Sequence, residues 1–182
     1  SYIAGHNYKW MLSPRGCSWL VNLESNQSSP MTPLSPGWHS VQAPNQGYFG
    51  AAPLSPSMSR LDGGLPWLPW LGGTAALEML LNVDHAAVER QALDLATLLR
   101  KELAARSLRV AATGLPSHIL RVYTPRAAEL QRRLAIDKIV LSANQNSLRI
   151  GVHGFNNHDD VIRLLTVVDE WLGKNGREKT YV

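Results

Sequence analysis

The segment HNYKWMLSPRG, residues 6–16, contains the side chains with the clearest capacity for chemistry. Lys9 lies between two aromatic residues, Tyr8 and Trp10, in a polar turn that is expected to join two strands. A lysine amine that is desolvated or has cationic neighbours becomes a nucleophile toward aldehydes. Tyr8 and His6 add hydrogen-bond donors suited to a phosphate. From the residues alone, an ordinary loop lysine whose stem lies along Trp10 is the commoner alternative.

The elements around this turn are short strands followed by a long loop. Residues 2–4 and 17–23 are β-prone. Residues 24–66 are rich in Ser, Pro, Gly, Asn and Gln, and a loop of this length is usually functional or disordered. We expect three aromatic residues to order part of this loop: Trp38, Tyr48 and Phe49.

The rest of the sequence alternates helical and β-prone segments. Apolar periodicity predicts four helices, which begin after Gly73 and after Asp84 and span residues 126–135 and 159–172. Asp84 fits a helix N-cap, and Asn157 with Asp160 fits a reciprocal capping pair. The expected strands are residues 107–112, 118–123, 138–141 and 148–152. Helices packed on one small sheet predict an α/β sandwich from Asp84 to the C-terminus.

Length and cysteine content restrict the class of protein. The chain has 182 residues, 45% of them apolar, which suits one large domain or two small ones. Its single thiol, Cys17, cannot form an internal disulfide and is expected to be a core residue. With no cleavable signal sequence at the start, these features indicate a cytoplasmic protein. No run approaches the roughly 20 consecutive apolar residues of a membrane span.

The charge pattern argues against a nucleic-acid partner. The formal net charge is +4, and the basic spots are small: Arg100 with Lys101, and Arg126 with Arg132 and Arg133. The second group has the pattern of a solvated helix face, whereas nucleic-acid binders present a basic stripe with interleaved aromatic residues. No metal-ligand spacing is present either.

Three segments follow one another in an order and spacing that resemble a known family. They are YKWMLSPRG at residues 8–16, RLDGGLP at 60–66 with GGTAALE at 72–78, and SLRIGVHGFNNHDDV at 147–161. The family is the class V aminotransferases, fold-type I pyridoxal-phosphate (PLP) enzymes that include cysteine desulfurases, isopenicillin N epimerase-like proteins, kynureninases and carbon–sulfur lyases. The resemblance implies that residues 1–83 end the PLP-binding large domain and that residues 84–182 form a small C-terminal α/β sandwich domain.

The resemblance also implies roles for individual residues. Lys9 would be the Schiff-base lysine and, once freed by substrate, would shuttle the α-proton. Tyr8 would donate a hydrogen bond to the cofactor phosphate, and His6 is a weaker candidate for the same role, with a structural histidine as the alternative. Arg149 would hold the α-carboxylate of the substrate, because a guanidinium matches a carboxylate with two hydrogen bonds. Pairing of Arg149 with a neighbouring acid is the alternative. The apolar neighbours Leu148 and Ile150 place Arg149 on the opposite face of its strand, which is consistent with either role.

Departures from the family pattern narrow the expected chemistry. Leu65 stands where many relatives have a threonine that reaches the cofactor phosphate of the partner subunit. Cysteine desulfurases place a nucleophilic cysteine on a mobile loop before the C-terminal arginine, and Cys17 does not match it, so persulfide-forming chemistry is disfavoured. Because the ring-binding residues of the family lie upstream of Ser1, we expect a fragment or a companion chain, with Lys9 ordered only by that neighbour. Alone, the chain is expected to be colourless and inactive.

The sequence therefore predicts a PLP-dependent enzyme that acts on an amino acid or a related small molecule. Lyase, epimerase and aminotransferase reactions share their first steps, and the YKW turn favours the epimerase-like and carbon–sulfur lyase members. A non-catalytic scaffold that keeps the fold is the alternative. Residues 66–71, PWLPWL, would suit a membrane interface but lack a basic flank. We expect this apolar cluster at a homodimer interface or at the mouth of the site instead.

Overall fold

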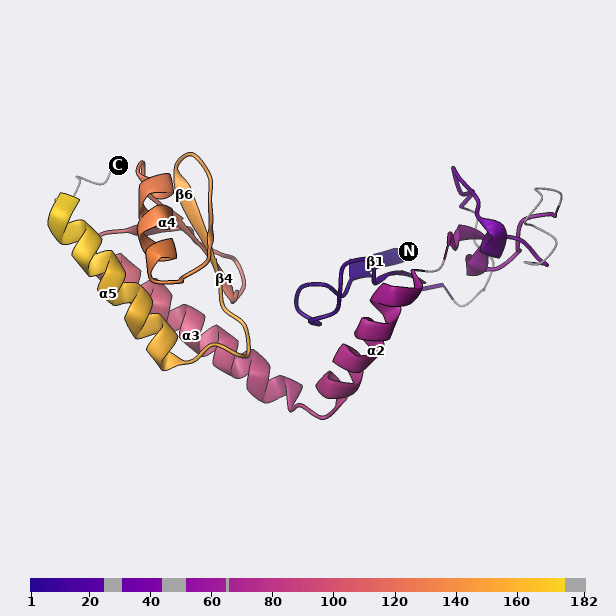
Figure 1. The fold of residues 1–182 in the computed structure, drawn as a ribbon, viewed down its shortest axis with the longest axis horizontal. Coiled ribbons are helices and arrows are strands. Elements are labelled where there is room, and N and C mark those ends of the chain that lie inside the picture. The colour runs from indigo at the N-terminus through magenta and orange to yellow at the C-terminus, as the bar shows by residue number, and fades with distance from the viewer. Residues whose placement is uncertain (25–30, 44–51, 65, 176–182) are drawn as a thin grey trace. The chain divides into compact units, whose positions relative to one another are not determined.

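A computed structural model describes residues 1–24, 31–43, 52–64 and 66–175 (Figure 1). The chain divides into two compact units, Ser1–Val83 and Asp84–Val182. Each unit is described by itself below.

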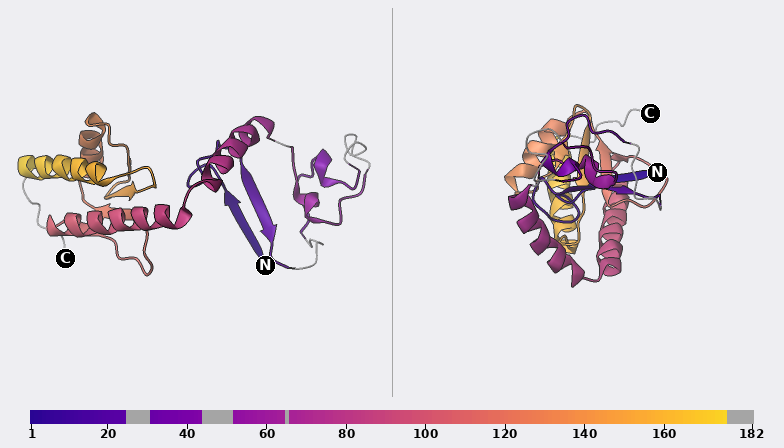
Figure 2. Two further views of the ribbon diagram at one scale, coloured as in Figure 1. Left: turned by 90° about the horizontal axis from the view of Figure 1, so that it is seen from below. Right: turned by 90° about the vertical axis from the view of Figure 1, so that its right-hand side faces the viewer.

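The first unit begins with a β-hairpin that confirms the two predicted strands. Strand β1 (Tyr2–His6) pairs antiparallel with β2 (Ser18–Asn22), with Tyr2 opposite Asn22 and His6 opposite Ser18 (Figure 2, left). The connecting turn contains Gly16 at a φ of 106°, a conformation that glycine adopts without steric cost.

Helix α2 (Trp67–Leu81) starts earlier than the sequence pattern predicts. We expected a helix only after Gly73, because Pro69 and the two glycines read as breakers. Pro69 is the third residue of the helix, where a backbone N–H has no intrahelical partner, so its missing donor costs nothing. Within the described residues, no helix is both long enough and apolar enough to cross a membrane.

The two glycines of α2 mark its contact with the hairpin turn. A Cβ atom on Gly72 would lie 2.6 Å from Cγ of Pro14, and one on Gly73 would lie 2.9 Å from Sγ of Cys17. Both distances are shorter than side chains tolerate, so the close approach of turn and helix requires glycine at these positions. The turn that carries Lys9 is thus packed on a helix of its own chain. The expectation that only a neighbouring chain or segment orders it is wrong.

The loop between β2 and α2 contains two short 3-10 helices, η1 (Trp38–Ser40) and η2 (Met58–Leu61). Trp38 opens η1, and Ser40 is buried, with its hydroxyl accepting from Gly37 N–H and donating to the Asp62 carbonyl. The other aromatic residues expected to order this loop, Tyr48 and Phe49, lie outside the described residues, as does Leu65.

The second unit is the predicted α/β sandwich. Its helices are α3 (His85–Ala105), α4 (Ala127–Ile136) and α5 (His158–Asn175). Its strands are β3 (Arg109–Val110), β4 (Ile119–Tyr123), β5 (Ser142–Ala143) and β6 (Ser147–Gly151). They form an antiparallel sheet in the order β3-β4-β6-β5.

The core of this unit lies between the three helices and one face of the sheet. Leu120 and Val122 of β4 and Leu148 and Ile150 of β6 are buried with side chains of all three helices. The residues between them face away from the helices, since side chains alternate along a strand. Arg149 is exposed on that opposite face, as predicted from its buried neighbours.

The helix caps are confirmed. Asp84 accepts a hydrogen bond from Ala87 N–H at 3.0 Å. At the start of α5, Asp160 N–H donates to the side chain of Asn157, and Asn157 N–H donates to the side chain of Asp160, both at 3.1 Å. This reciprocal pair is a capping box.

The strand predicted at residues 138–141 is wrong. Helix α4 ends in a Schellman motif, in which Lys138 has a φ of 60° and the N–H of Ile139 donates to the carbonyl of Leu134. The chain must leave this cap before it can pair, so the strand β5 begins later, at Ser142. Lysine in place of the usual glycine at the left-handed position hid the cap from the sequence pattern.

Candidate functional site

Three of the predicted site residues lie together in the first unit: His6 and Lys9 are close to the ring of Tyr8. The rings of His6 and Tyr8 are stacked with centroids 4.2 Å apart. Nζ of Lys9 lies 5.3 Å from the centroid of the Tyr8 ring. Lys9 and His6 are exposed and Tyr8 is half-buried, so all three are accessible from solvent.

A fourth residue of this cluster, Arg15, was missed by sequence reasoning. Its Cζ lies 5.2 Å from the centroid of the Tyr8 ring, so Tyr8 has two cations within cation–π distance. The available signal was a second basic residue in the same turn as Lys9. His6, Tyr8, Lys9 and Arg15 together form what we call the Tyr8 cluster, which offers an amine, a phenol, an imidazole and a guanidinium to an anionic ligand.

The Tyr8 cluster is held by Asn7, a second residue that sequence reasoning missed. Asn7 is buried, with 3% of its surface exposed. Its N–H donates to the Cys17 carbonyl at 2.9 Å, and its own carbonyl accepts from Ser13 N–H at 3.1 Å. Its side-chain oxygen accepts from Nε1 of Trp19 at 2.8 Å. These bonds close the turn on both sides of Lys9 and fix the backbone from which Tyr8 and Lys9 project.

Cys17 is a core residue, as predicted. Its side chain is fully buried, and its thiol donates to the carbonyl of Pro69 in α2 at 3.1 Å. A thiol in this position is not presented on a loop that can carry it to a substrate.

Arg149 lies in the second unit, on the face of the sheet that the helices leave open. It stands opposite Arg121 on β4 and Ser142 on β5. None of the ion pairs among the described residues includes Arg149, and the four strands contain no Asp or Glu. The alternative, that Arg149 forms an ion pair with a neighbouring acidic residue, therefore has no support in the described part of the chain.

His118, just before β4 and near Arg149, has a pKa below the ordinary histidine value. Partial burial disfavours the imidazolium, and electrostatic interactions with His153 and Arg149 add to the effect. His118 therefore stays neutral at a lower pH than an ordinary histidine, whose pKa is about 6.5.

Acidification is expected to destabilise the fold through His118. Because its folded-state pKa lies below the unfolded value of about 6.5, its contribution to the free energy of unfolding is complete above that pH and falls below it. Urea denaturation at neutral pH and near pH 5 should show a smaller acid-induced loss of stability for His118→Asn than for the parent. His158→Asn, at an exposed histidine, is the control. Equal losses in the parent and in His118→Asn would contradict the expectation.

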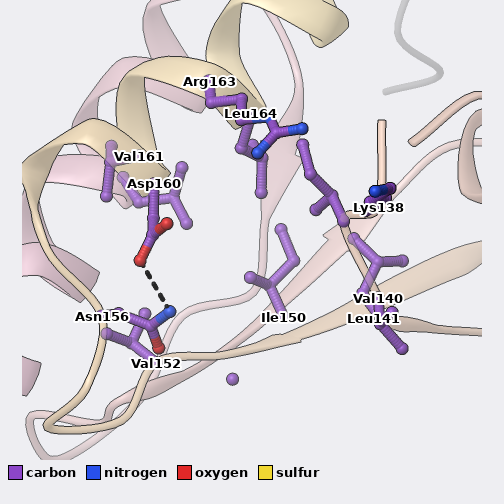
Figure 3. Close-up of a pocket in the computed structure, with 13 residues that line it drawn as sticks. Lys138, Val140, Leu141, Ile150, Val152, Asn156, Asp160, Val161, Arg163 and Leu164 are labelled. Carbon is purple, nitrogen blue, oxygen red and sulfur yellow. Dashed lines mark hydrogen bonds between the residues drawn. The ribbon is translucent and has the colours of Figure 1, made fainter. Parts of the chain in front are cut away.

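A cavity of about 190 Å³ lies on the helix side of the second unit (Figure 3). Two of its charged groups, Asp160 and Arg163, already have partners: Asp160 accepts from the Asn156 amide at 3.0 Å, and Arg163 donates to the Asp137 carbonyl at 2.7 Å. The cavity is smaller than the roughly 300–1,000 Å³ typical of ligand pockets. Arg149 does not line it, so this cavity is not the candidate site. Among the residues that the structure describes, no group of three or more His, Cys, Asp or Glu side chains is placed to hold a metal ion.

Comparison with solved structures identifies the fold. The chain matches the cysteine desulfurase of Thermococcus onnurineus NA1 with a TM-score of 0.81 and 14% identity, over 95% of this chain and 47% of that one. It matches the cysteine desulfurase CsdA of Escherichia coli with a TM-score of 0.81 and 24% identity, over 96% and 46%. A third match, at a TM-score of 0.75 and 19% identity over 93% and 46%, is the cystine C-S lyase C-DES in complex with its product cysteine persulfide.

These matches confirm the predicted fold class, since the chain has the mixed α/β fold of the matched structures. The chain spans about half the length of the structures it matches, 46–47%. No protein-family model matches the sequence, and no curated protein sequence matches it significantly. One of the matched structures, a Lys-to-Ala variant of C-DES, has glycine covalently linked to its PLP cofactor.

Proposed function

We propose that this chain is the C-terminal half of a PLP-dependent enzyme of the class V aminotransferase family that acts on an amino acid. The observation that carries the proposal is the Tyr8 cluster: an exposed lysine beside a phenol, an imidazole and a guanidinium, on a turn of defined geometry. The fold supports it, since the matched structures include cysteine desulfurases and a C-DES variant that contains a PLP cofactor.

The residues of the Tyr8 cluster fit the cofactor. Its phosphate is a dianion, for which the phenol of Tyr8, the guanidinium of Arg15 and the imidazole of His6 are suitable partners. The amine of Lys9 is exposed and available for the covalent bond to the cofactor aldehyde. When bound, PLP supplies an electron sink that stabilises negative charge at the α-carbon of the substrate.

The chain's own residues then have distinct tasks. Nζ of Lys9 would hold the cofactor and would accept the α-proton of the substrate and return it. Arg149 holds the α-carboxylate with two parallel hydrogen bonds. These two tasks are common to lyases, epimerases and aminotransferases. Persulfide-forming chemistry is disfavoured for Cys17, because its thiol is buried and bonded to α2.

We propose that the remaining half of the enzyme is supplied by the same polypeptide or by a companion chain, and that the assembly is cytoplasmic. The complete enzyme is used below in the sense of this assembly. Neither a nucleic acid nor a membrane is a partner in this proposal.

Borohydride trapping tests the function. The complete enzyme is incubated with PLP, reduced with borohydride and digested, and the pyridoxyl group is located by mass spectrometry. We expect a single stoichiometric pyridoxyl group on Lys9 and a visible absorbance band that reduction removes. Absence of any cofactor from a folded complete enzyme would contradict the function and favour the non-catalytic scaffold.

The complete enzyme is expected to be a homodimer. Trp67, Leu68 and Leu71 at the start of α2 are exposed by 70%, 79% and 71%, a concentration of apolar surface that suits contact with a second copy. Light scattering should give the mass of a dimer, and the double variant Trp67→Ser, Leu71→Ser should shift it toward the monomer. Leu115→Ser, at an equally exposed leucine, should not. An active parent that is monomeric would contradict this prediction.

A further inference from the structure

Two arginines stand directly opposite each other on the open face of the small-domain sheet. Arg121 of β4 is the register partner of Arg149 of β6, and both side chains are exposed. The sheet hydrogen bonds show what kind of pair this is. Val152 N–H donates to the His118 carbonyl, so His118 and Val152, which lie just beyond the two strands, form a hydrogen-bonded pair. Arg121 and its partner Arg149 are three positions further along the same register.

Hydrogen-bonded and non-hydrogen-bonded pairs alternate along an antiparallel ladder, so Arg121 and Arg149 form a non-hydrogen-bonded pair. The bond from Ala111 N–H to the Arg121 carbonyl agrees, because it directs the Arg121 backbone toward the strand on its other side. In such a pair the Cα atoms are only about 4.5 Å apart and the side chains are at their closest. The two guanidinium groups therefore start from adjacent points on one surface.

Like charges directly opposite each other destabilise a sheet. Nothing in the described strands offsets this pair, since none of them contains an acidic residue. The positions that flank the pair in the same row, Ala111 and Ser142, have small side chains and leave space on either side. A third arginine of this face, Arg109, differs from the pair: it lies over the ring of Tyr123, with Cζ 4.7 Å from the centroid.

We propose that Arg121 and Arg149 form a two-point anion site, and that the substrate of this enzyme is an amino acid with a second acidic group. Arg149 holds the α-carboxylate and Arg121 holds the second carboxylate or an equivalent oxyanion. The assignment of the substrate class rests on the proposed function, whereas the two-point anion site stands on the sheet geometry. Arg121 is then the residue that discriminates diacid from monoacid substrates, because a monoacid leaves its guanidinium unpaired.

The site is tested on the 182-residue chain by following the arginine Nε–H signals in NMR titrations. The probes are glutarate, with two carboxylates, and butyrate, with one, at constant ionic strength and neutral pH. Glutarate should shift the signals of both Arg121 and Arg149, and butyrate mainly that of Arg149. Arg121→Gln should weaken glutarate binding about tenfold, the loss of one charge-assisted pair, and leave butyrate binding unchanged.

Three further variants complete the test. Arg149→Gln should weaken both probes, and Arg121→Lys should recover part of the glutarate affinity, since it keeps the charge without the fork. Arg109→Gln removes the same charge from the same face and should change neither affinity. Without ligand, Arg121→Gln should also raise the urea midpoint, because it relieves the repulsion between the paired arginines. That rise establishes that the variant folds.

The proposal is overturned if glutarate fails to shift the Arg121 signal, if Arg121→Gln weakens butyrate as much as glutarate, or if Arg109→Gln has the same effect as Arg121→Gln. Failure of the proposed function looks different. In that case Lys9 acquires no pyridoxyl group in the trapping experiment, while the chain still binds glutarate more tightly than butyrate. This combination would support the anion site and contradict the assignment of the substrate class.

Discussion

Replacement of Lys9 by alanine is expected to remove the borohydride-fixed pyridoxyl group and, with it, the activity of the complete enzyme. The Tyr8 cluster places one primary amine, that of Lys9, beside the proposed phosphate partners. Without this amine the covalent attachment has no nucleophile and the α-proton has no base to accept it. The loss of a nucleophile or general base commonly lowers rates by about a hundredfold to ten-thousandfold. Mass spectrometry after reduction measures the attachment, and steady-state kinetics measures the rate.

Two comparisons make the Lys9 experiment specific. Lys101→Ala, at an exposed lysine of α3, removes an equal charge and should leave both the pyridoxyl group and the activity unchanged. Lys9→Arg keeps the charge near Tyr8 but cannot form the covalent bond, so it should be as inactive as Lys9→Ala. A Lys9→Ala protein that still carries a stoichiometric pyridoxyl group would show that another lysine binds the cofactor.

Replacement of Arg149 by glutamine is expected to separate substrate binding from cofactor binding. Charge-assisted hydrogen bonds contribute about 1.5–3 kcal/mol each, and about 1.4 kcal/mol corresponds to a factor of ten, so the affinity for the amino acid should fall about tenfold to a hundredfold. The pyridoxyl group on Lys9 should be unaffected, because Arg149 takes no part in its attachment. Substrate titration and borohydride trapping on the same preparation measure the two effects.

The matched control for Arg149 is Arg109→Gln, which lies on the same face of the sheet over the ring of Tyr123. It should change the substrate affinity little. An Arg149→Gln enzyme with the affinity of the parent would show that the substrate carboxylate is held elsewhere.

The sequence was most informative where local chemistry decides the structure. The caps at Asp84 and at Asn157 with Asp160 use side chains whose preference for helix starts is strong, and the alternation of Leu148, Arg149 and Ile150 fixed the faces of β6 before any contact was known. These features depend on neighbours within about four residues along the chain, and the structure confirms them.

The failures have a common physical origin in contacts between distant residues. Gly72 and Gly73 read as helix breakers because their partners, Pro14 and Cys17, lie more than fifty residues upstream. Asn7 gave no signal, since an asparagine in a polar turn is ordinary until its buried hydrogen bonds are seen. Tertiary packing determined these positions, and intrinsic propensity did not.

The contact between the hairpin turn and α2 makes Cys17 a native reporter of local opening. It is the chain's only thiol, and alkylation requires its sulfur to leave the carbonyl of Pro69 and the space left by Gly73. The rate of modification by a thiol reagent therefore measures how often the turn that carries Lys9 separates from the helix. A ligand that binds the Tyr8 cluster only when the turn is closed would lower this rate, because it stabilises the closed state. The dependence of the Cys17 modification rate on ligand concentration would therefore give the dissociation constant of compounds that have no absorbance signal of their own.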